Sequence, residues 1–126
     1  MPMVTTDIDQ LTEECNTWRE ALRSQREEFS RMKNQLQNAA AHITSKDALK
    51  AVDHYENQFD IQLSNIHDLK QSIKAHNKMF ACQLTENDSP PVMIDDHEKI
   101  GTNYQDLRRT LNELKSDFQR FLINYS

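Results

Sequence analysis

The stretch from residue 49 to residue 84 contains neither glycine nor proline, and one of its rows is apolar at every seventh position. Residues seven apart return to nearly the same angle on a helix, so this row marks the middle of one helical face. The two rows beside it are half apolar, which makes the face wider than a two-stranded seam needs. We therefore expect this helix to contact two other helices at once. The central row consists of Val52, Phe59, Ile66, Ile73 and Phe80.

Two further segments carry an alternating three-and-four spacing of apolar residues, which predicts a coiled-coil-like seam. One covers about residues 7–43 and the other about residues 95–125, with the organising helix over about residues 45–84 between them. Three helices of similar length joined by short and medium links favour an up-down-up order. We therefore predict an all-α fold, an elongated antiparallel up-down-up three-helix bundle that forms a single domain over residues 1–126.

Capping signals and prolines predict where these helices begin. Thr44 and Ser45 are good N-terminal caps for the second helix. Pro90 and Pro91 each disfavour helix in the residue before them. We therefore expect the third helix to begin near Asp95, which is followed three residues later by a glutamate in the manner of a capping box.

The composition excludes several classes of partner. The net charge of −5 without a basic patch argues against nucleic acid. No apolar run approaches the roughly 20 residues that span a bilayer, so we expect no membrane partner. The N-terminal stretch lacks the basic and apolar regions of a signal peptide, and the chain has only two cysteines, Cys15 and Cys82. These features favour a reducing, cytoplasmic location, although a signal peptide removed earlier would leave no trace.

Folding the chain back at its two links gives a register for the bundle. Phe29 then lies beside Phe59, and Phe59 beside Phe121, in one aromatic layer. The third helix would end level with Tyr55, so the tip of the first hairpin would project by roughly 15 Å. We expect this tip either to contact a protein partner or a second copy, or to close on itself through small alanines. The predicted contact residues are Leu36, Ala39, Ile43, Leu49 and Val52.

The five histidines do not form a metal site within one helix. Ligands on one helix need spacings of three or four residues, and no two histidines have such a spacing. We therefore predict no metal ligand, no cofactor and no catalytic residue. A site built across helices stays open, for example His76 with Glu13 or Asn16 at a similar height in the register.

Several single residues admit a structural interpretation. Cys15 falls in the first seam and is interpreted as a small buried hydrophobe. Trp18 is interpreted as a packing residue that stacks on the stem of Lys70. Gly101, the only glycine, marks either a late helix start or a close helix contact. Four polar residues on the flanks of the central helix either fix the register or line a pocket: Glu56, Lys70, His76 and Asn77.

The absence of common catalytic motifs shapes the functional prediction. With one glycine, the chain cannot build a phosphate-cradling loop by the usual means, and it has no G-x-S-x-G motif. We predict that the protein is not an enzyme but a structural or protein-interaction bundle that presents rigid helical surface to a partner or a second copy. One alternative is a metal- or small-ligand-binding bundle that uses histidines and carboxylates from different helices. Another is an acidic inhibitor that blocks a basic partner.

About half of the chain carries a family resemblance. The stretch YENQFDIQLSNIHDLKQSIKAHN at residues 55–77, together with WREALRSQREEFSRMKNQLQ at residues 18–37, resembles small uncharacterised all-helical proteins of Bacteroidota. The matching features are an aromatic residue plus NQF at mid-chain and a histidine–aspartate step before an LK pair. The resemblance implies a bacterial, cytoplasmic helical protein and carries no active residues.

Overall fold

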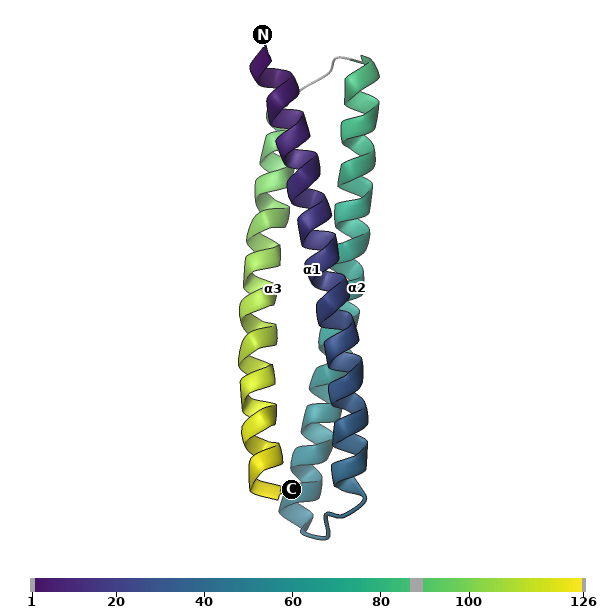
Figure 1. Cartoon of the computed structure of the whole chain (residues 1–126), viewed down its shortest axis with the longest axis vertical. Coiled ribbons are helices and arrows are strands. Elements are labelled where there is room, and N and C mark those ends of the chain that lie inside the picture. Colours follow the sequence, from purple (N-terminus) through teal and green to yellow (C-terminus); the bar gives the residue numbers. More distant parts are fainter. Residues whose placement is uncertain (1, 87–89, 126) are drawn as a thin grey trace.

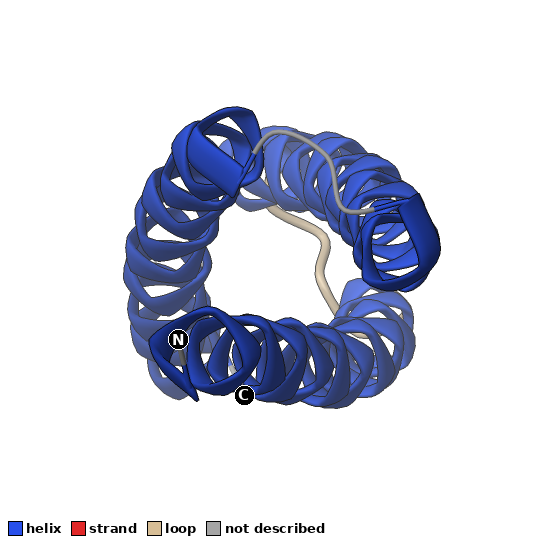
Figure 2. Cartoon of the chain, turned by 90° about the horizontal axis from the view of Figure 1, so that it is seen from above, coloured by secondary structure: helices blue, strands red, loops and turns tan. Residues whose placement is uncertain are grey.

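The computed structural model describes residues 2–86 and 90–125, and it describes side chains for residues 9–78 and 95–124. Three α-helices make up this part of the chain: α1 (Pro2–Ala40), α2 (Lys46–Glu86) and α3 (Pro90–Tyr125). Helices α1 and α3 run in the same direction and α2 runs against them (Figure 1). Seen along the long axis, the helices surround a common centre (Figure 2), and each contacts both of the others. The predicted all-α three-helix bundle is confirmed.

The hairpin between α1 and α2 is short and capped. The amides of His42 and Ile43 donate to the carbonyls of Ala39 and Ala40, which tightens the end of α1. Ser45 lies just before α2, and its hydroxyl accepts a hydrogen bond from the amide of Ala48 at 3.4 Å. This contact is the N-cap geometry that the sequence predicted for this position.

Helix α3 begins at Pro90, earlier than the predicted start near Asp95. The first turn of a helix needs no intrahelical amide donors, so prolines are tolerated there. The prediction treated the two prolines as the end of a loop, whereas they form the first turn of the helix. Asp95 therefore lies inside α3 and does not cap it. The side chains of residues 92–94, which we expected to pack on the end of the bundle, lie outside the described residues.

A single apolar core runs along the bundle axis, and its aromatic centre is shared by the three helices. The rings of Phe29 and Phe59 make an edge contact with centroids 5.7 Å apart, as the predicted α1–α2 register requires. Among the described side chains, fifteen buried apolar residues form the core cluster: Cys15, Leu22, Phe29, Met32, Leu36, Val52, Phe59, Ile66, Leu69, Ile73, Tyr104, Leu111, Leu114, Phe118 and Phe121.

The predicted register of α3 is wrong by about one helical turn. Phe59 contacts Phe118, with centroids 4.9 Å apart, whereas the prediction paired it with Phe121. Phe121 instead packs on Tyr55, with centroids 5.2 Å apart. The reason is the early start of α3, which shortens the α2–α3 link and moves each α3 residue towards the first hairpin.

This shift removes most of the projecting tip that the sequence predicted. The C-terminal end of α3 reaches towards the α1–α2 hairpin (Figure 1), and the Tyr55 hydroxyl donates to the carbonyl of Asp117 at 3.2 Å. Of the five predicted contact residues, Leu36 and Val52 are buried in the core, Ala39 and Ile43 are half-buried, and only Leu49 is exposed. Contact between the tip and a partner stays a prediction.

Among the described side chains, lysine–carboxylate ion pairs join neighbouring helices at the surface. Lys33 Nζ lies 2.6 Å from Asp60 Oδ1 across α1 and α2, and Lys115 Nζ lies 2.8 Å from Glu28 Oε1 across α3 and α1. The hydrogen bond to Asp60 raises the pKa of Lys33. Surface pairs of this kind, which stay in contact with solvent, contribute little to stability, so packing of the core dominates. Within the described helices, no segment combines the length and apolar character that crossing a membrane requires.

The aromatic centre leads to a stability prediction. Phe59 is fully buried, so we expect Phe59→Ala to lower the free energy of unfolding by about 3–5 kcal/mol. Ile61 is 42% exposed on the same helix, and we expect Ile61→Ala to cost less than about 1 kcal/mol. Urea unfolding followed by circular dichroism measures both. Equal losses in the two variants would contradict the placement of the core.

Candidate metal centre

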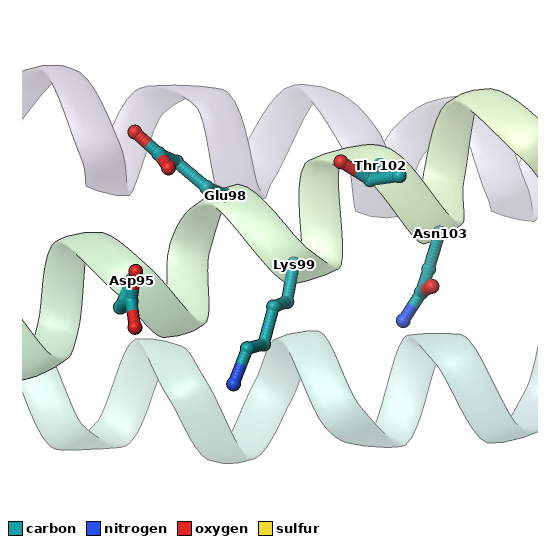
Figure 3. A pocket seen from close by; sticks show the side chains of 5 residues that line it. All are labelled: Asp95, Glu98, Lys99, Thr102 and Asn103. Carbon is teal, nitrogen blue, oxygen red and sulfur yellow. The ribbon is translucent and has the colours of Figure 1, made fainter.

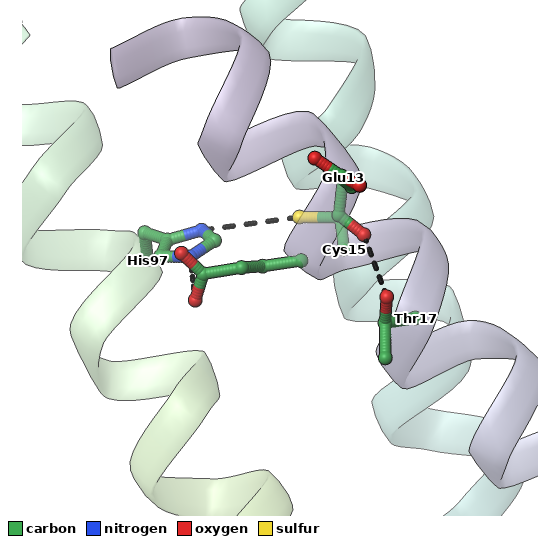
Figure 4. A network of polar contacts seen from close by, with 5 residues as sticks. Glu13, Cys15, Thr17 and His97 are labelled. Atoms are coloured by element: carbon green, nitrogen blue, oxygen red, sulfur yellow. Dashed lines mark hydrogen bonds and ion pairs between the residues drawn. The ribbon is translucent and has the colours of Figure 1, made fainter. Parts of the chain in front are cut away.

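Each of the three helices brings one potential metal ligand to the same height of the bundle. These ligands are Cys15 of α1, His76 of α2 and His97 of α3, and all three are buried. One ligand atom from each residue lies within 4.8 Å of the other two. Cys15 Sγ and His97 Nδ1 are 3.9 Å apart (Figure 4), and the rings of His76 and His97 have centroids 5.4 Å apart. The cluster is therefore a thiol and two imidazoles that converge from three directions.

The heptad pattern explains why these side chains point inward. Cys15 lies seven residues before Leu22 and fourteen before Phe29 on the buried stripe of α1. His97 lies seven residues before Tyr104 on the buried stripe of α3. His76 lies seven residues after Leu69 on α2. Each ligand therefore occupies a core position, where an apolar residue is usual.

Burial governs the protonation of two of these ligands. It raises the pKa of the Cys15 thiol to about 11, and the nearby charge of Glu14 acts in the same direction, while Arg19 opposes both. Burial also lowers the pKa of His76, as does the charge of His97, while Asp96 acts in the opposite direction. In both residues burial disfavours the charged form, so the metal-free cluster favours a neutral thiol and a neutral His76 imidazole.

His97 is held by contacts on its ring and on both nitrogens. The Trp18 ring stacks on it, with centroids 4.7 Å apart and an interplanar angle of 30°. Trp18 also stacks on Tyr104, with centroids 5.8 Å apart. Glu14 Oε2 lies 3.5 Å from His97 Nε2, opposite the Nδ1 atom that faces Cys15.

Because Gly101 has no side chain, the Trp18 indole can pack closely against α3 at this position. A Cβ atom added at Gly101 would lie 3.3 and 3.4 Å from two carbons of the indole ring. The glycine therefore marks a close contact between α1 and α3, the second of the two interpretations that the sequence left open. The described ring partners of Trp18 are on α3, whereas we had predicted the Lys70 stem on α2.

His76 lies in a cluster formed across helices, as the open alternative required, but its neighbours there are Cys15 and His97 in place of Glu13 and Asn16. The side chains of Glu13 and Asn16 are exposed, and Figure 4 shows Thr17 donating to the backbone carbonyl of Glu13. The sequence missed His97 because the predicted α3 seam began at Ile100. Counting back seven residues from Tyr104 would have placed His97 in that seam. The side chain of Cys82 lies outside the described residues.

The other polar flank residues of α2 lie apart from this cluster. Lys70 borders a surface hollow between α1 and α2. The negative charge of Glu56 helps to raise the pKa of Lys33. Both are half-buried, as is Asn77. Four α1 residues complete the hollow beside Lys70: Asn16, Arg19, Glu20 and Arg23.

A second surface hollow lies along α3 (Figure 3). Its five residues come from this one helix, and all five side chains are exposed: Asp95, Glu98, Lys99, Thr102 and Asn103. No buried polar group among them fixes a ligand, so the buried cluster is the stronger candidate for chemistry.

Comparison with known proteins gives no relative: no family model, no curated protein and no solved structure matches the chain. The resemblance to proteins of Bacteroidota therefore stays a prediction. The candidate site has to be judged on its own geometry.

The lowered pKa of His76 predicts a loss of stability in mild acid. In the unfolded chain His76 binds a proton with its ordinary pKa of 6.5, whereas in the folded chain its pKa is lower, so it binds the proton only at lower pH. The metal-free protein should therefore lose stability as the pH falls from about 7.5 to about 5.5. We expect this loss to shrink in His76→Gln. The exposed His67, on the same helix, supplies the control His67→Gln, and urea titrations at each pH supply the measurement. An identical pH slope in all three proteins would refute the assignment.

The contact at Gly101 predicts a local change around the indole. Alanine favours a helix over glycine by about 1 kcal/mol, but its Cβ would press on Trp18. We expect Gly101→Ala to change the free energy of unfolding by less than about 1 kcal/mol because the two effects offset each other. The fluorescence of Trp18, the only tryptophan, should shift. Thr102→Ala, at an exposed neighbour, should leave the emission unchanged. Unaltered emission in Gly101→Ala would contradict the close contact.

Proposed function

We propose that this protein is a metal-binding helical bundle that holds one transition-metal ion of the zinc class between its three helices. The observation that carries the proposal is the convergence of Cys15, His76 and His97, one from each helix, with ligand atoms within 4.8 Å of one another. This proposal takes up the ligand-binding alternative from the sequence, with a thiol in place of the carboxylates expected there.

The spacing of the ligand atoms supports a small ion. In a tetrahedral site, zinc–sulfur and zinc–nitrogen bonds of about 2.3 and 2.0–2.1 Å place one sulfur and two nitrogen ligand atoms about 3.3–3.6 Å apart. The distance of 3.9 Å between Cys15 Sγ and His97 Nδ1 is close to this range. Side-chain movements of an ångström or less would therefore bring the three ligands into coordination.

The chemistry of the ligands narrows the class of metal. Thiolate and imidazole are preferred by zinc, copper and related transition metals, whereas magnesium and calcium prefer oxygen ligands. A thiol with a pKa of about 11 must lose its proton when the metal binds, so binding releases a proton at neutral pH. The site would thus exchange a buried proton for a buried metal ion.

The burial of the ligands supports a role in binding and not in catalysis. Cys15, His76 and His97 are 0%, 3% and 5% exposed, respectively. A structural zinc site has four protein ligands, whereas a catalytic site has three and an open position, so three ligands alone leave one position for another group. The burial of all three ligands restricts the access of a substrate to that position. An enclosed ion joined to all three helices would tie together the end of the bundle away from the first hairpin. In this proposal, the three-helix bundle is the scaffold that encloses the metal ion.

Metal titration of the reduced protein tests this function. We expect one Zn²⁺ or Co²⁺ ion per chain, with Co²⁺ giving the absorption bands of a thiolate complex. Cys15→Ser and His76→Gln should each weaken zinc binding by about tenfold or more, measured by competition with a chromophoric chelator. Zinc at about 100 times its Kd should raise the free energy of unfolding by about 2.7 kcal/mol.

Two matched variants control this experiment. Cys82→Ser removes the other thiol and His67→Gln removes an exposed histidine of α2, and both should bind zinc as the natural chain does. Circular dichroism verifies that each variant is folded. Zinc affinity that is unchanged in Cys15→Ser, or a chain that takes up no metal, would overturn the proposal.

A further inference from the structure

We propose that Glu14 is a positioning residue that makes His97 a ligand through Nδ1 and matches the site to a divalent ion such as Zn²⁺ in preference to Cu⁺. The inference rests on the proposed metal-binding function. The inference specifies which nitrogen of His97 binds the metal and which charge of metal ion the site prefers. The three ligands alone determine neither.

The two nitrogens of His97 face different groups. Nδ1 lies 3.9 Å from Cys15 Sγ, towards the cluster, and Nε2 lies 3.5 Å from Glu14 Oε2, away from it. Glu14 and Cys15 are adjacent on α1, so one short segment of this helix approaches both sides of the ring. The carboxylate acts on the imidazole from the outside and does not compete for the position between the three ligands.

This arrangement selects one form of the neutral imidazole. A carboxylate beside Nε2 favours the tautomer with its proton on that atom, so the Nδ1 lone pair faces Cys15 and the position between the three ligands. A partner on the second nitrogen is a common feature of histidines that bind metals, because it fixes the ring orientation and raises the basicity of the ligand. Stacking by Trp18 restricts the ring further.

The count of charges separates divalent from monovalent ions. A Cys15 thiolate and two neutral imidazoles carry one negative charge, and Glu14 supplies a second beside the site. The thiolate alone neutralises a monovalent ion, whereas a divalent ion leaves the buried ligands with one positive charge, which Glu14 neutralises. Two further charges lie near the ligands and are opposite in sign: Arg19 acts on Cys15, and Asp96 acts on His76. Because an uncompensated buried charge is costly, the set favours the divalent ion.

Glu14 can supply this charge without being buried itself. Its side chain is 43% exposed, whereas that of His97 is 7% exposed. The carboxylate therefore stays partly hydrated while it contacts the buried ring. Its neighbour Glu13 is exposed and forms no described contact with the cluster, which makes it a matched control one residue away.

The test compares Glu14→Gln with Glu13→Gln in the full reduced chain. We expect Glu14→Gln to weaken Zn²⁺ binding by about 10–100-fold and to change Cu⁺ binding by less than about threefold, both by chelator competition. Glu13→Gln should leave both affinities unchanged. Glu14→Asp, which keeps the charge on a shorter side chain, should recover part of the zinc affinity.

A second measurement needs no metal. Nitrogen-15 NMR of the imidazoles in the metal-free natural chain should show His97 with its proton on Nε2, and Glu14→Gln should increase the other tautomer. This readout separates positioning of the ring from a general loss of stability.

The outcomes distinguish this inference from the function on which it rests. A natural chain that binds zinc, with Glu14→Gln binding it equally well, overturns the role of Glu14 and leaves the metal site standing. A natural chain that binds Cu⁺ and no Zn²⁺ overturns the divalent preference alone. A chain that binds neither ion overturns the proposed function, and the inference with it. A His97 proton on Nδ1 in the metal-free chain also overturns the positioning role.

Discussion

Contact of aromatic rings at the centre of the bundle is the constraint on which the rest of the structure depends. Phe29, Phe59 and Phe118 are fully buried, one from each helix, and Phe59 contacts both of the others. Rings of this size fill the space between three helices only when the helices lie at one relative height. This contact sets the height of every other residue, including polar residues several turns away.

Polar residues at core positions have a cost that the aromatic centre must offset. Cys15, His76 and His97 lie on the inward stripes of their helices, where an apolar residue would contribute more to folding. Placing all three at one height concentrates this cost in a single layer. Stability alone does not account for a layer of this composition, because apolar residues at these positions would stabilise the bundle more.

The sequence predicted the part of the fold that depends on local periodicity. Seven-residue spacing was enough for the three helices and their buried faces. The Ser45 cap followed from its residue type, and the pairing of Phe29 with Phe59 followed from folding the chain back at the short first link. The register of α3 was not predicted, because it depends on whether Pro90 closes a loop or opens a helix, and both are compatible with proline. The predicted α3 seam also began at Ile100 and left out His97, so the cluster was missed although its residues all occupy heptad positions. Glu14 was missed because its role depends on a contact across helices.

The order of the donors along the chain has a consequence for when the cluster can exist. Cys15 and His97 are 82 positions apart, and His76 lies between them on the middle helix. During synthesis α1 and α2 can pair as a hairpin before α3 is complete, but that hairpin contains only two of the three donors. Bringing residues this far apart together closes a long loop, whose entropic cost falls on the last helix to dock. An ion that needs all three donors would therefore bind only after α3 has docked, so a bound ion would indicate that folding is complete.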